Sequence, residues 1–306
     1  RTAAMIDQRF IIVAGKGGVG RTTLAAALAS CFARKNLRTL LASADAHEKN
    51  LGRIFGRPIG TQRTRVAENL EVVHIKPMDS IKEYALMLLK LRYLQQLLTG
   101  THVMQSFVAN IPGIAEWAVM GKVTYHLIEK HDGRYLYDRV ILDAPPTGHS
   151  LSLIKIPAYI SEVVRTGPLN AVATERLRLV TDPRTTGILV VTIPEEMAVS
   201  EALDMNQAIT RDLGVPVLGA LVNRTIAPLF TPEEERALRD LSARAPRSDA
   251  VRAARFRVSR THLQARQIER IGRSMPVTLI PELGSGRMDL DAIETLSGIL
   301  EKKLCP

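Results

Sequence analysis

Residues 15–23 read GKGGVGRTT, the stretch of the sequence that says most about its fold. It follows a short apolar run at residues 10–14 and precedes an alanine-rich helical run at residues 24–33. A strand, a glycine-rich loop and a helix in this order form a phosphate-binding loop, because backbone N–H groups and the positive end of the helix dipole point into one concavity. The sequence therefore predicts that the chain binds a nucleoside triphosphate at this loop.

The residues of this loop have separate expected roles. The hydroxyl of Thr22 would reach Mg²⁺, and the side chain at position 21 would reach the β and γ phosphates. The ordinary pattern places Lys at position 21, whereas this chain has Arg21, whose planar guanidinium is not interchangeable with an ammonium group. We therefore expect ATP and Mg²⁺ as cofactors, and we expect the exchange to affect catalysis more than binding. The expected phosphate-binding residues are Gly15, Lys16, Gly17, Gly18, Val19, Gly20, Arg21, Thr22 and Thr23.

Short, continuously apolar segments recur along the chain and predict buried parallel strands. They lie at residues 38–44, 70–75, 139–142, 187–193, 217–222 and 277–280. Helical stretches separate them; the clearest are residues 196–213 and residues 232–245, the second with Thr231 as the expected N-cap. Strands that alternate with helices predict the α/β fold of a P-loop NTPase, in which a mostly parallel, twisted sheet carries helices on both faces.

The chain between the strands at residues 70–75 and 139–142 is too long for one crossover connection. Helical stretches are expected there at residues 80–98, 103–110 and 114–130, and the same region holds Met78, Met87, Met104 and Met120. We expect one discontinuous nucleotide-binding domain, residues 1–75 and 132–306, interrupted by an inserted helical subdomain at residues 76–131. Methionine-rich helices can form an adaptable groove for an apolar protein client, although sequence alone favours packing of the subdomain against itself.

Two acidic residues end predicted strands and are the candidates for the metal side of the site. Asp143 precedes a loop that contains Pro145, Pro146 and Gly148, where a P-loop protein holds Mg²⁺ or its bound water. Asp45 ends another strand before a polar turn at residues 46–56, and it either holds a magnesium-bound water or caps the next helix. With Lys16 and Arg21, these two carboxylates form the expected catalytic set.

A third strand end supplies the candidates for the nucleotide base. Asn223 either reads an adenine edge through paired hydrogen bonds or forms a turn. Arg224, next to it, and Pro281, after the last strand, complete the expected nucleotide contacts. His149 is a conceivable base, but a hydrogen-bonded structural role in the loop after Asp143 is the favoured interpretation.

Four segments together resemble a known family. GKGGVGRTT, ILDAPPTGHSL, IPEEMAVSEAL and LVNR are similar to motifs of the ArsA/Get3 family, a branch of the deviant Walker A NTPases that also include ParA and MinD. The resemblance extends from about residue 10 to residue 300 and implies an ATPase that acts as a dimeric switch. It also implies that Lys16 reaches across the dimer interface to the nucleotide of the partner subunit, in a homodimer or a heterodimer.

The chain departs from the family pattern where water is activated. The segment DAHEKNLGRIFG at residues 45–56 places Arg53 where the family has the aspartate that orients the attacking water. A guanidinium cannot accept a proton as a carboxylate does, so Arg21 and Arg53 together predict weak hydrolysis. The alternative is a pseudo-ATPase, a regulatory subunit that binds nucleotide and pairs with an intact paralogue.

The composition leaves a polyanionic partner open. The formal net charge is +10 and the pI about 9.8, and arginines are densest at residues 244–273. An arginine-rich solvated helix is the favoured interpretation of that stretch; the alternatives are an anionic lipid surface or nucleic acid, as in a ParA-like positioning ATPase.

Other sequence features exclude whole classes of site. Cys31 and Cys305 are too few for a disulfide framework, a zinc site or the cysteine cluster of arsenite pumps. The absence of a long apolar run or a signal peptide predicts a cytoplasmic protein without a transmembrane segment. Because residue 1 is Arg, we expect the numbering to begin inside a longer chain, with Met5 as a conceivable natural start.

Overall fold

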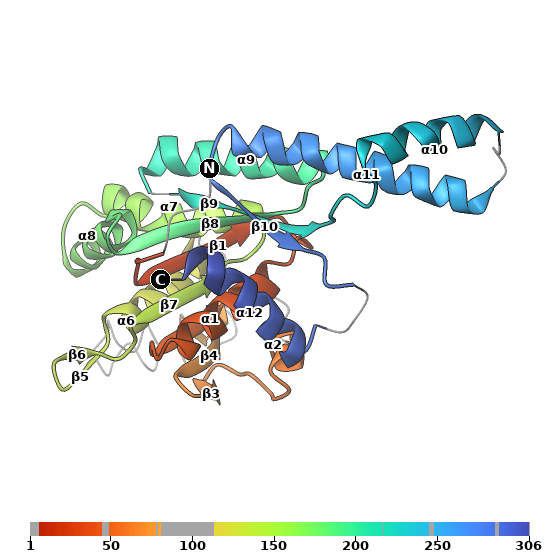
Figure 1. Ribbon diagram of the computed structural model, residues 1–306. Helices are drawn as coiled ribbons and strands as arrows, with labels where there is room; N and C mark the ends of the chain where they lie inside the picture. The colour runs from red at the N-terminus through yellow and green to blue at the C-terminus, as the bar shows by residue number, and fades with distance from the viewer. Residues whose placement is uncertain are drawn as a thin grey trace, which may run out of the picture.

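The computed structural model describes residues 6–44, 49–77, 79–80, 113–215, 217–244, 248–284 and 288–305. Within these residues, eight strands form one sheet in the order β10-β9-β8-β1-β7-β2-β4-β3 (Figure 1). The strands are β1 (Phe10–Gly15), β2 (Thr39–Ser43), β3 (Thr64–Ala67), β4 (Leu70–His74), β7 (Arg139–Asp143), β8 (Thr186–Thr192), β9 (Val217–Thr225) and β10 (Val277–Pro281). All neighbouring pairs are parallel except β3 and β4, so the α/β fold with a mostly parallel sheet is confirmed.

The central strand shows why the predicted strands are continuously apolar. Phe10, Ile12 and Ala14 pack into a cluster on one face of the sheet, whereas Ile11 and Val13 pack into a second cluster on the other face. Side chains of a strand alternate between faces, so a strand covered on both sides must be apolar at every position.

Helices cover each face of the sheet. One face carries α1 (Arg21–Arg34), α2 (Lys49–Ile54) and α12 (Leu290–Leu304). The other carries α6 (Ile114–Ile128), α7 (Thr147–Val163), α8 (Pro168–Thr181), α9 (Glu196–Leu213) and the end of α11 (Asp249–Gly272). The long α11 pairs with α10 (Pro232–Arg244), and in Figure 1 this helical pair extends beyond the sheet.

Several local predictions are confirmed. Helix α9 has the predicted bounds and ends at Gly214, which adopts a left-handed conformation with φ 62°. Thr231 caps α10: its hydroxyl accepts from the N–H of Glu234, and the Glu234 carboxylate accepts from the N–H of Thr231 at 2.7 Å. This reciprocal arrangement satisfies two backbone donors that the helix itself leaves unpaired.

Other elements were missed or wrongly assigned. The polar turn expected at residues 46–56 contains α2, and the short edge strand β3 and the hairpin of β5 (Lys130–His131) and β6 (Arg134–Tyr135) have no counterpart in the prediction. The two cysteines, for which the sequence predicts no disulfide framework, are joined as a disulfide, Cys31–Cys305, between α1 and the residue after α12.

Most of the predicted insertion, including Met78, Met87 and Met104, lies outside the described residues. Its last helix, α6, packs Trp117, Met120 and Val123 into the same core cluster as the central strand. The division into residues 1–75 with 132–306 and a subdomain at 76–131 stays a prediction. Among the described helices, none is long and apolar enough to span a membrane.

Candidate nucleotide site

The glycine-rich loop joins β1 to α1 and has the backbone that its sequence requires. Gly18 and Gly20 have φ angles of 84° and 94°, a left-handed region that glycine enters without the cost borne by other residues. Gly20 is also the N-cap of α1, and a Cβ atom added there would collide with the side-chain amide of Asn223. Position 20 therefore needs glycine for both its conformation and its neighbour.

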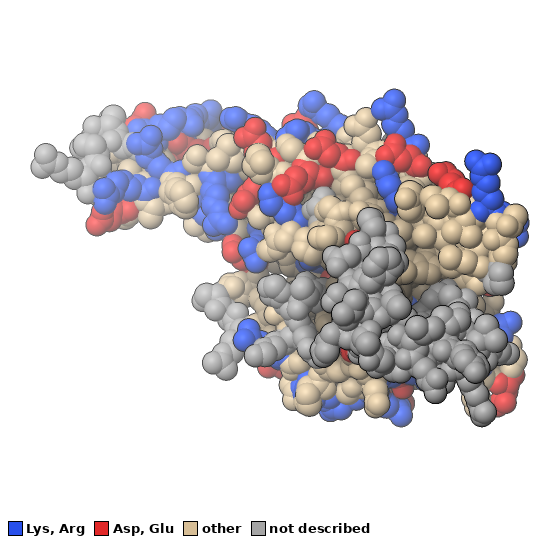
Figure 2. Space-filling view, turned by 180° about the vertical axis from the view of Figure 1, so that it is seen from behind, with Lys and Arg blue, Asp and Glu red and all other residues tan. Residues whose placement is uncertain are grey.

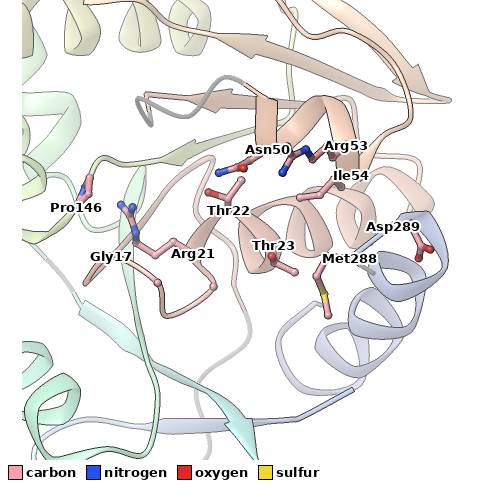
Figure 3. A pocket seen from close by; sticks show the side chains of 12 residues that line it. Gly17, Arg21, Thr22, Thr23, Asn50, Arg53, Ile54, Pro146, Met288 and Asp289 are labelled. Atoms are coloured by element: carbon pink, nitrogen blue, oxygen red, sulfur yellow. The ribbon is translucent and has the colours of Figure 1, made fainter. Parts of the chain in front are cut away.

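A cavity of about 1080 Å³ lies beside this loop (Figure 3). Its volume is at the upper end of the ~300–1,000 Å³ range of small-molecule sites. The lining residues come from the loop and α1, from α2, from the segment after β7 and from the segment before α12. They are Gly17, Gly18, Gly20, Arg21, Thr22, Thr23, Asn50, Arg53, Ile54, Pro146, Met288 and Asp289.

Asp143 connects the loop to two neighbouring strands. It is fully buried at the end of β7, and its Oδ2 accepts hydrogen bonds from the hydroxyls of Thr22 at 2.8 Å and Ser43 at 3.0 Å. Ser43 ends β2 and is the register partner of Asp143. Three elements therefore converge on one carboxylate at the carboxyl edge of the sheet.

The donor set fits a magnesium ion held mainly by phosphate and water. Thr22 gives its hydroxyl proton to Asp143, which leaves the oxygen lone pairs available to a metal, and Asp143 is placed to accept from a metal-bound water. Among the described residues, no group of three His, Cys, Asp or Glu side chains could hold a metal on its own. Mg²⁺ usually keeps several waters and binds through few protein ligands, as this arrangement would require.

Arg21 bridges two loops at the cavity wall. The side chain is only 5% exposed, and its guanidinium donates to the carbonyl of Ala144, directly after Asp143. Figure 3 shows Arg21 extending from α1 toward Pro146. The residue at the expected phosphate position therefore contacts the segment that follows β7.

Lys16 does not line the cavity of its own chain. Its Nζ forms an ion pair with Glu201 of α9 at 2.6 Å, and the two side chains are 41% and 33% exposed. An exposed pair of this kind contributes about 0–1 kcal/mol and is easily exchanged.

Both the nitrogen and the oxygen of the Asn223 side-chain amide form hydrogen bonds with backbone groups. Its Nδ2 donates to the carbonyl of Val19 at 2.9 Å, and its Oδ1 accepts from the N–H of Arg224, whose φ is 55°. These contacts are those of the turn-forming alternative. Asn223, Arg224 and Pro281 do not line the cavity, and their expected contacts with the base stay a prediction.

The remaining candidates have different outcomes. Asp45 lies outside the described residues. His149, in the first turn of α7, is 75% exposed and forms an ion pair with Glu116 of α6 at 3.6 Å. Arg53 lines the cavity from α2, beside Asn50 in Figure 3.

Sequence reasoning missed Ser43, Ile54, Met288 and Asp289. Ser43 could have been found, because parallel neighbours end at the same edge and Ser43 is the last residue of its strand. Met288 and Asp289 belong to no motif. They reach the cavity because α12 packs against α1, with Asp289 as the N-cap of α12.

Comparisons with known proteins show the family of this chain. The sequence matches the family described as Anion-transporting ATPase over residues 8–174. The ATPase ASNA1 homolog 1 of Paramecium tetraurelia is 35% identical over 156 residues, which cover 49% of this chain and 44% of that protein. The ATPase GET3 of Mycosarcoma maydis is 32% identical over 166 residues, which cover 52% and 46%.

A longer match exists at lower identity. The ATPase BagA of Mycobacterium tuberculosis is 24% identical over 233 residues, which cover 74% of this chain and 68% of that protein. The chain thus matches less than half the length of the first two relatives. The family match covers more than half of the chain, including the phosphate loop, Arg53 and Asp143, and the chain belongs to the Anion-transporting ATPase family, in agreement with its ArsA/Get3 motifs.

Proposed function

We propose that this chain binds Mg·ATP in the cavity and acts as a dimeric switch with weak hydrolysis of its own. The observation that carries the proposal is the position of Arg21, which joins the phosphate loop to the segment after β7. A bound phosphate competes with the Ala144 carbonyl for the guanidinium, because charge-assisted hydrogen bonds are about twice as strong as neutral ones. Nucleotide occupancy is thereby coupled to Pro146, which precedes α7.

Helix α7 carries that coupling away from the site. It packs against α6, α8 and α9, and α6 is the last helix of the predicted subdomain. Movement of the start of α7 would therefore shift α6 and the subdomain to which it belongs. We propose that this subdomain binds a hydrophobic protein client. That client site is an extension of the proposal and concerns residues outside the described ranges.

Binding of the nucleotide uses the chain's own groups in three ways. The loop N–H groups and Arg21 would hold the phosphates, Thr22 and Asp143 would hold Mg²⁺ and its water, and Arg53 lines the cavity from α2. The metal ion, when bound, neutralises charge on the β and γ phosphates. Lys16 leaves Glu201 and reaches the nucleotide of a partner subunit, where an added cation stabilises charge that develops on the transferred phosphate.

Arg53 supports the proposal of weak hydrolysis. It occupies the cavity wall but has no oxygen that could accept a proton from water. General-base catalysis contributes roughly 10²–10⁴-fold to such reactions. In a second form of the proposal, the chain pairs with an intact paralogue that activates the water. This form rests on the same two residues, Arg21 and Arg53.

The test is steady-state phosphate release from Mg·ATP by the purified chain and by the double variant Arg21→Lys, Arg53→Asp. We expect slow phosphate release by the natural chain and release at least tenfold faster by the variant. General-base catalysis contributes about 10²–10⁴-fold, and the minimum expected here is set below that range because two substitutions restore the site imperfectly. Adding Lys16→Ala should abolish the gain. Fluorescent ATP binding is measured in parallel, and rapid turnover by the natural chain would show that its arginines are catalytically adequate.

A further inference from the structure

The helices α10 and α11 form an arm that the nucleotide site does not use. The arm, residues 232–272, extends in Figure 1 beyond the carboxyl ends of the strands. The second part of α11 packs on the body of the protein, through buried Ile271 and a hydrogen bond from Arg270 to the hydroxyl of Ser200 of α9, and Arg257 nearer the start donates to the carbonyl of Ala227. The first part of α11 has α10 as its neighbour, so much of its circumference faces outward.

One side of α11 faces away from both neighbours. Thr261 and Gln264 are buried, and the side-chain oxygen of Gln264 accepts a hydrogen bond from the N–H of Ile226, directly after β9. On the opposite side, residues spaced three or four apart share one face of the helix. This outer face consists of Arg252, Arg255, Phe256, Ser259, Leu263 and Arg266, all of them exposed.

Two large apolar side chains lie at the centre of the outer face. Phe256 is 69% exposed and Leu263 is 52% exposed, and they are two helical turns apart. Single exposed apolar residues are ordinary on protein surfaces, but an aromatic and a leucine aligned on a projecting helix form a contact surface.

The charges around this apolar pair are almost all positive. From residue 249 to 273, seven arginines are opposed only by Asp249 and Glu269, and Figure 2 shows Lys and Arg gathered along the projecting arm. Arg255, Arg260 and Arg266 make no hydrogen bond or ion pair with any residue in the described ranges. These guanidinium groups are therefore available to an external anion.

The acidic start of α10 does not cover this face. Its Glu235 binds His262 of α11 at 3.0 Å. His262 lies about 100° around the helix from Leu263, at the edge of the outer face rather than at its centre, and Arg255, seven residues earlier, lies at that same edge.

We infer that the outer face of α11 docks the protein onto an anionic lipid bilayer. The arginines bind headgroup phosphates, and Phe256 and Leu263 enter the boundary between headgroups and acyl chains. This occupant matches both properties of the face, because a lipid surface offers negative charge and an apolar layer beneath it. A nucleic-acid duplex offers apolar side chains only thymine methyl groups in the major groove or, at the cost of unstacking, the space between base steps. Single strands are bound through several stacked aromatic residues, whereas this face has one ring.

The test is cosedimentation of the full chain with vesicles, without nucleotide, so that the result is independent of the proposed switch. Vesicles of phosphatidylglycerol and phosphatidylcholine should bind the chain, with affinity that falls as salt rises, and pure phosphatidylcholine should not. Phe256→Ser with Leu263→Ser should lower the affinity about tenfold or more, because two apolar side chains no longer enter the bilayer. Val163→Ser on α7, where the valine is 60% exposed, is the matched control and should have no effect.

Removal of charge should have a separate effect. Arg255→Gln and Arg266→Gln should each weaken binding to the anionic vesicles about fivefold, the expected contribution of one basic residue near such a surface. The exposed Arg178 on α8 provides the control Arg178→Gln. Unchanged thermal unfolding confirms that each variant is folded.

Three results would overturn the inference. They are equal binding to phosphatidylcholine vesicles, undiminished binding by the Phe256→Ser, Leu263→Ser variant, and absence of binding at low salt. Duplex DNA that binds more tightly than the vesicles, and equally well to that variant, would assign the face to nucleic acid instead.

Discussion

Gly20 holds the phosphate loop in its shape, and its replacement should be costly. Its φ of 94° is unfavourable for any residue with a Cβ atom, and that atom would meet the Asn223 amide. We expect Gly20→Ala to lower the free energy of unfolding by about 1–3 kcal/mol and to abolish most ATP binding. Thermal unfolding and titration with a fluorescent ATP analogue measure the two effects.

Gly17 is the matched control for that experiment. A Cβ atom at position 17 would meet no other atom within 4 Å, and the backbone there is not left-handed. Gly17→Ala should therefore leave stability nearly unchanged. An equal loss of stability in both variants would contradict the role given to Gly20.

Asp143 should determine how ATP binding depends on magnesium. Asp143→Asn keeps one oxygen but replaces the other by an amide, so Thr22 and Ser43 can no longer both donate to the same charged group. A hydrogen bond to a charged group is worth about 1.5–3 kcal/mol, so we expect a loss of at least about tenfold in affinity for Mg·ATP. Binding without Mg²⁺ should change less.

Ser43→Ala separates the metal role of Asp143 from its structural role. It removes one donor to the carboxylate but leaves the contact with Thr22. Mg²⁺-dependent ATP affinity should survive in this variant. If Ser43→Ala and Asp143→Asn lowered the Mg²⁺-dependent ATP affinity equally, the carboxylate would be needed to hold the strands in place rather than to bind the metal.

The sequence predicted those site residues that lie in continuous motifs. Thr22 lies in the loop motif that follows β1, at the start of α1, and Asp143 is the last residue of β7, so the carboxyl edge of a parallel sheet brings them together. The pairing of Arg21 with Ala144 depends on side-chain direction across two loops, and no local pattern encodes it. Met288 and Asp289 enter the cavity through the packing of a helix near the end of the chain.

At the scale of elements, α6 contains a histidine whose titration should affect stability. His126 is only 8% exposed on its side chain, its Nδ1 lies 3.2 Å from Glu129, and its Nε2 has no hydrogen-bond partner among the described residues. Burial lowers the pKa of His126 below its usual value of 6.5, although Glu129 opposes the shift. The folded chain therefore binds this proton less readily than the unfolded chain does.

The sign of the pH effect follows from that difference. As pH falls through about 6.5, the unfolded chain takes up the proton on His126 before the folded chain does. The free energy of unfolding should therefore fall with pH, by at most about 1.4 kcal/mol per pH unit. The fall should end once the pH is below the pKa of His126 in the folded chain. Urea unfolding between pH 5 and 8 measures this. His126→Gln should flatten the dependence of the free energy of unfolding on pH. The control His131→Gln, where the side chain is 80% exposed, should not. An unaltered slope in His126→Gln would mean that other groups dominate.

Most of the strands that could be predicted are buried on both faces; the exception is β10, a predicted edge strand whose burial alternates. Residues 10–14 and 187–193 are continuously apolar because helices cover both sides of the sheet. Strand β3 is an edge strand whose burial alternates, and β5 and β6 have two residues each, too few for any periodicity. Helix α2 escaped prediction because its six residues, KNLGRI, include a glycine and carry no strong helical pattern.

At the scale of the whole molecule, the pair of Lys16 and Glu201 should control assembly. Lys16 cannot serve a partner subunit while it is bound to α9 of its own chain. Glu201→Gln should strengthen ATP-dependent dimerisation several-fold, since the exposed pair that must break is worth about 0–1 kcal/mol. Analytical ultracentrifugation with a non-hydrolysable ATP analogue measures the dimer.

The control removes an exposed ion pair elsewhere. Lys155 and Asp212 are 2.9 Å apart and are 41% and 47% exposed, so Asp212→Asn tests the loss of such a pair without touching Lys16. Dimerisation should not change in that variant. Dimerisation that is unaffected by both Glu201→Gln and Lys16→Ala would show that Lys16 is not at the interface.

The order of strands has a consequence for how the protein is made. Strand β1 lies inside the sheet between β7 and β8, although it comes first in sequence among the described strands. At ~5–20 residues per second, synthesis of the chain from Gly15 to Arg139 takes roughly 6 to 25 s. During that time the nascent chain presents a fully apolar strand with both edges unpaired, and Thr22 has no Asp143 to bind. This strand is therefore exposed to unwanted pairing until β7 has been made, and nucleotide can stabilise the protein only after that.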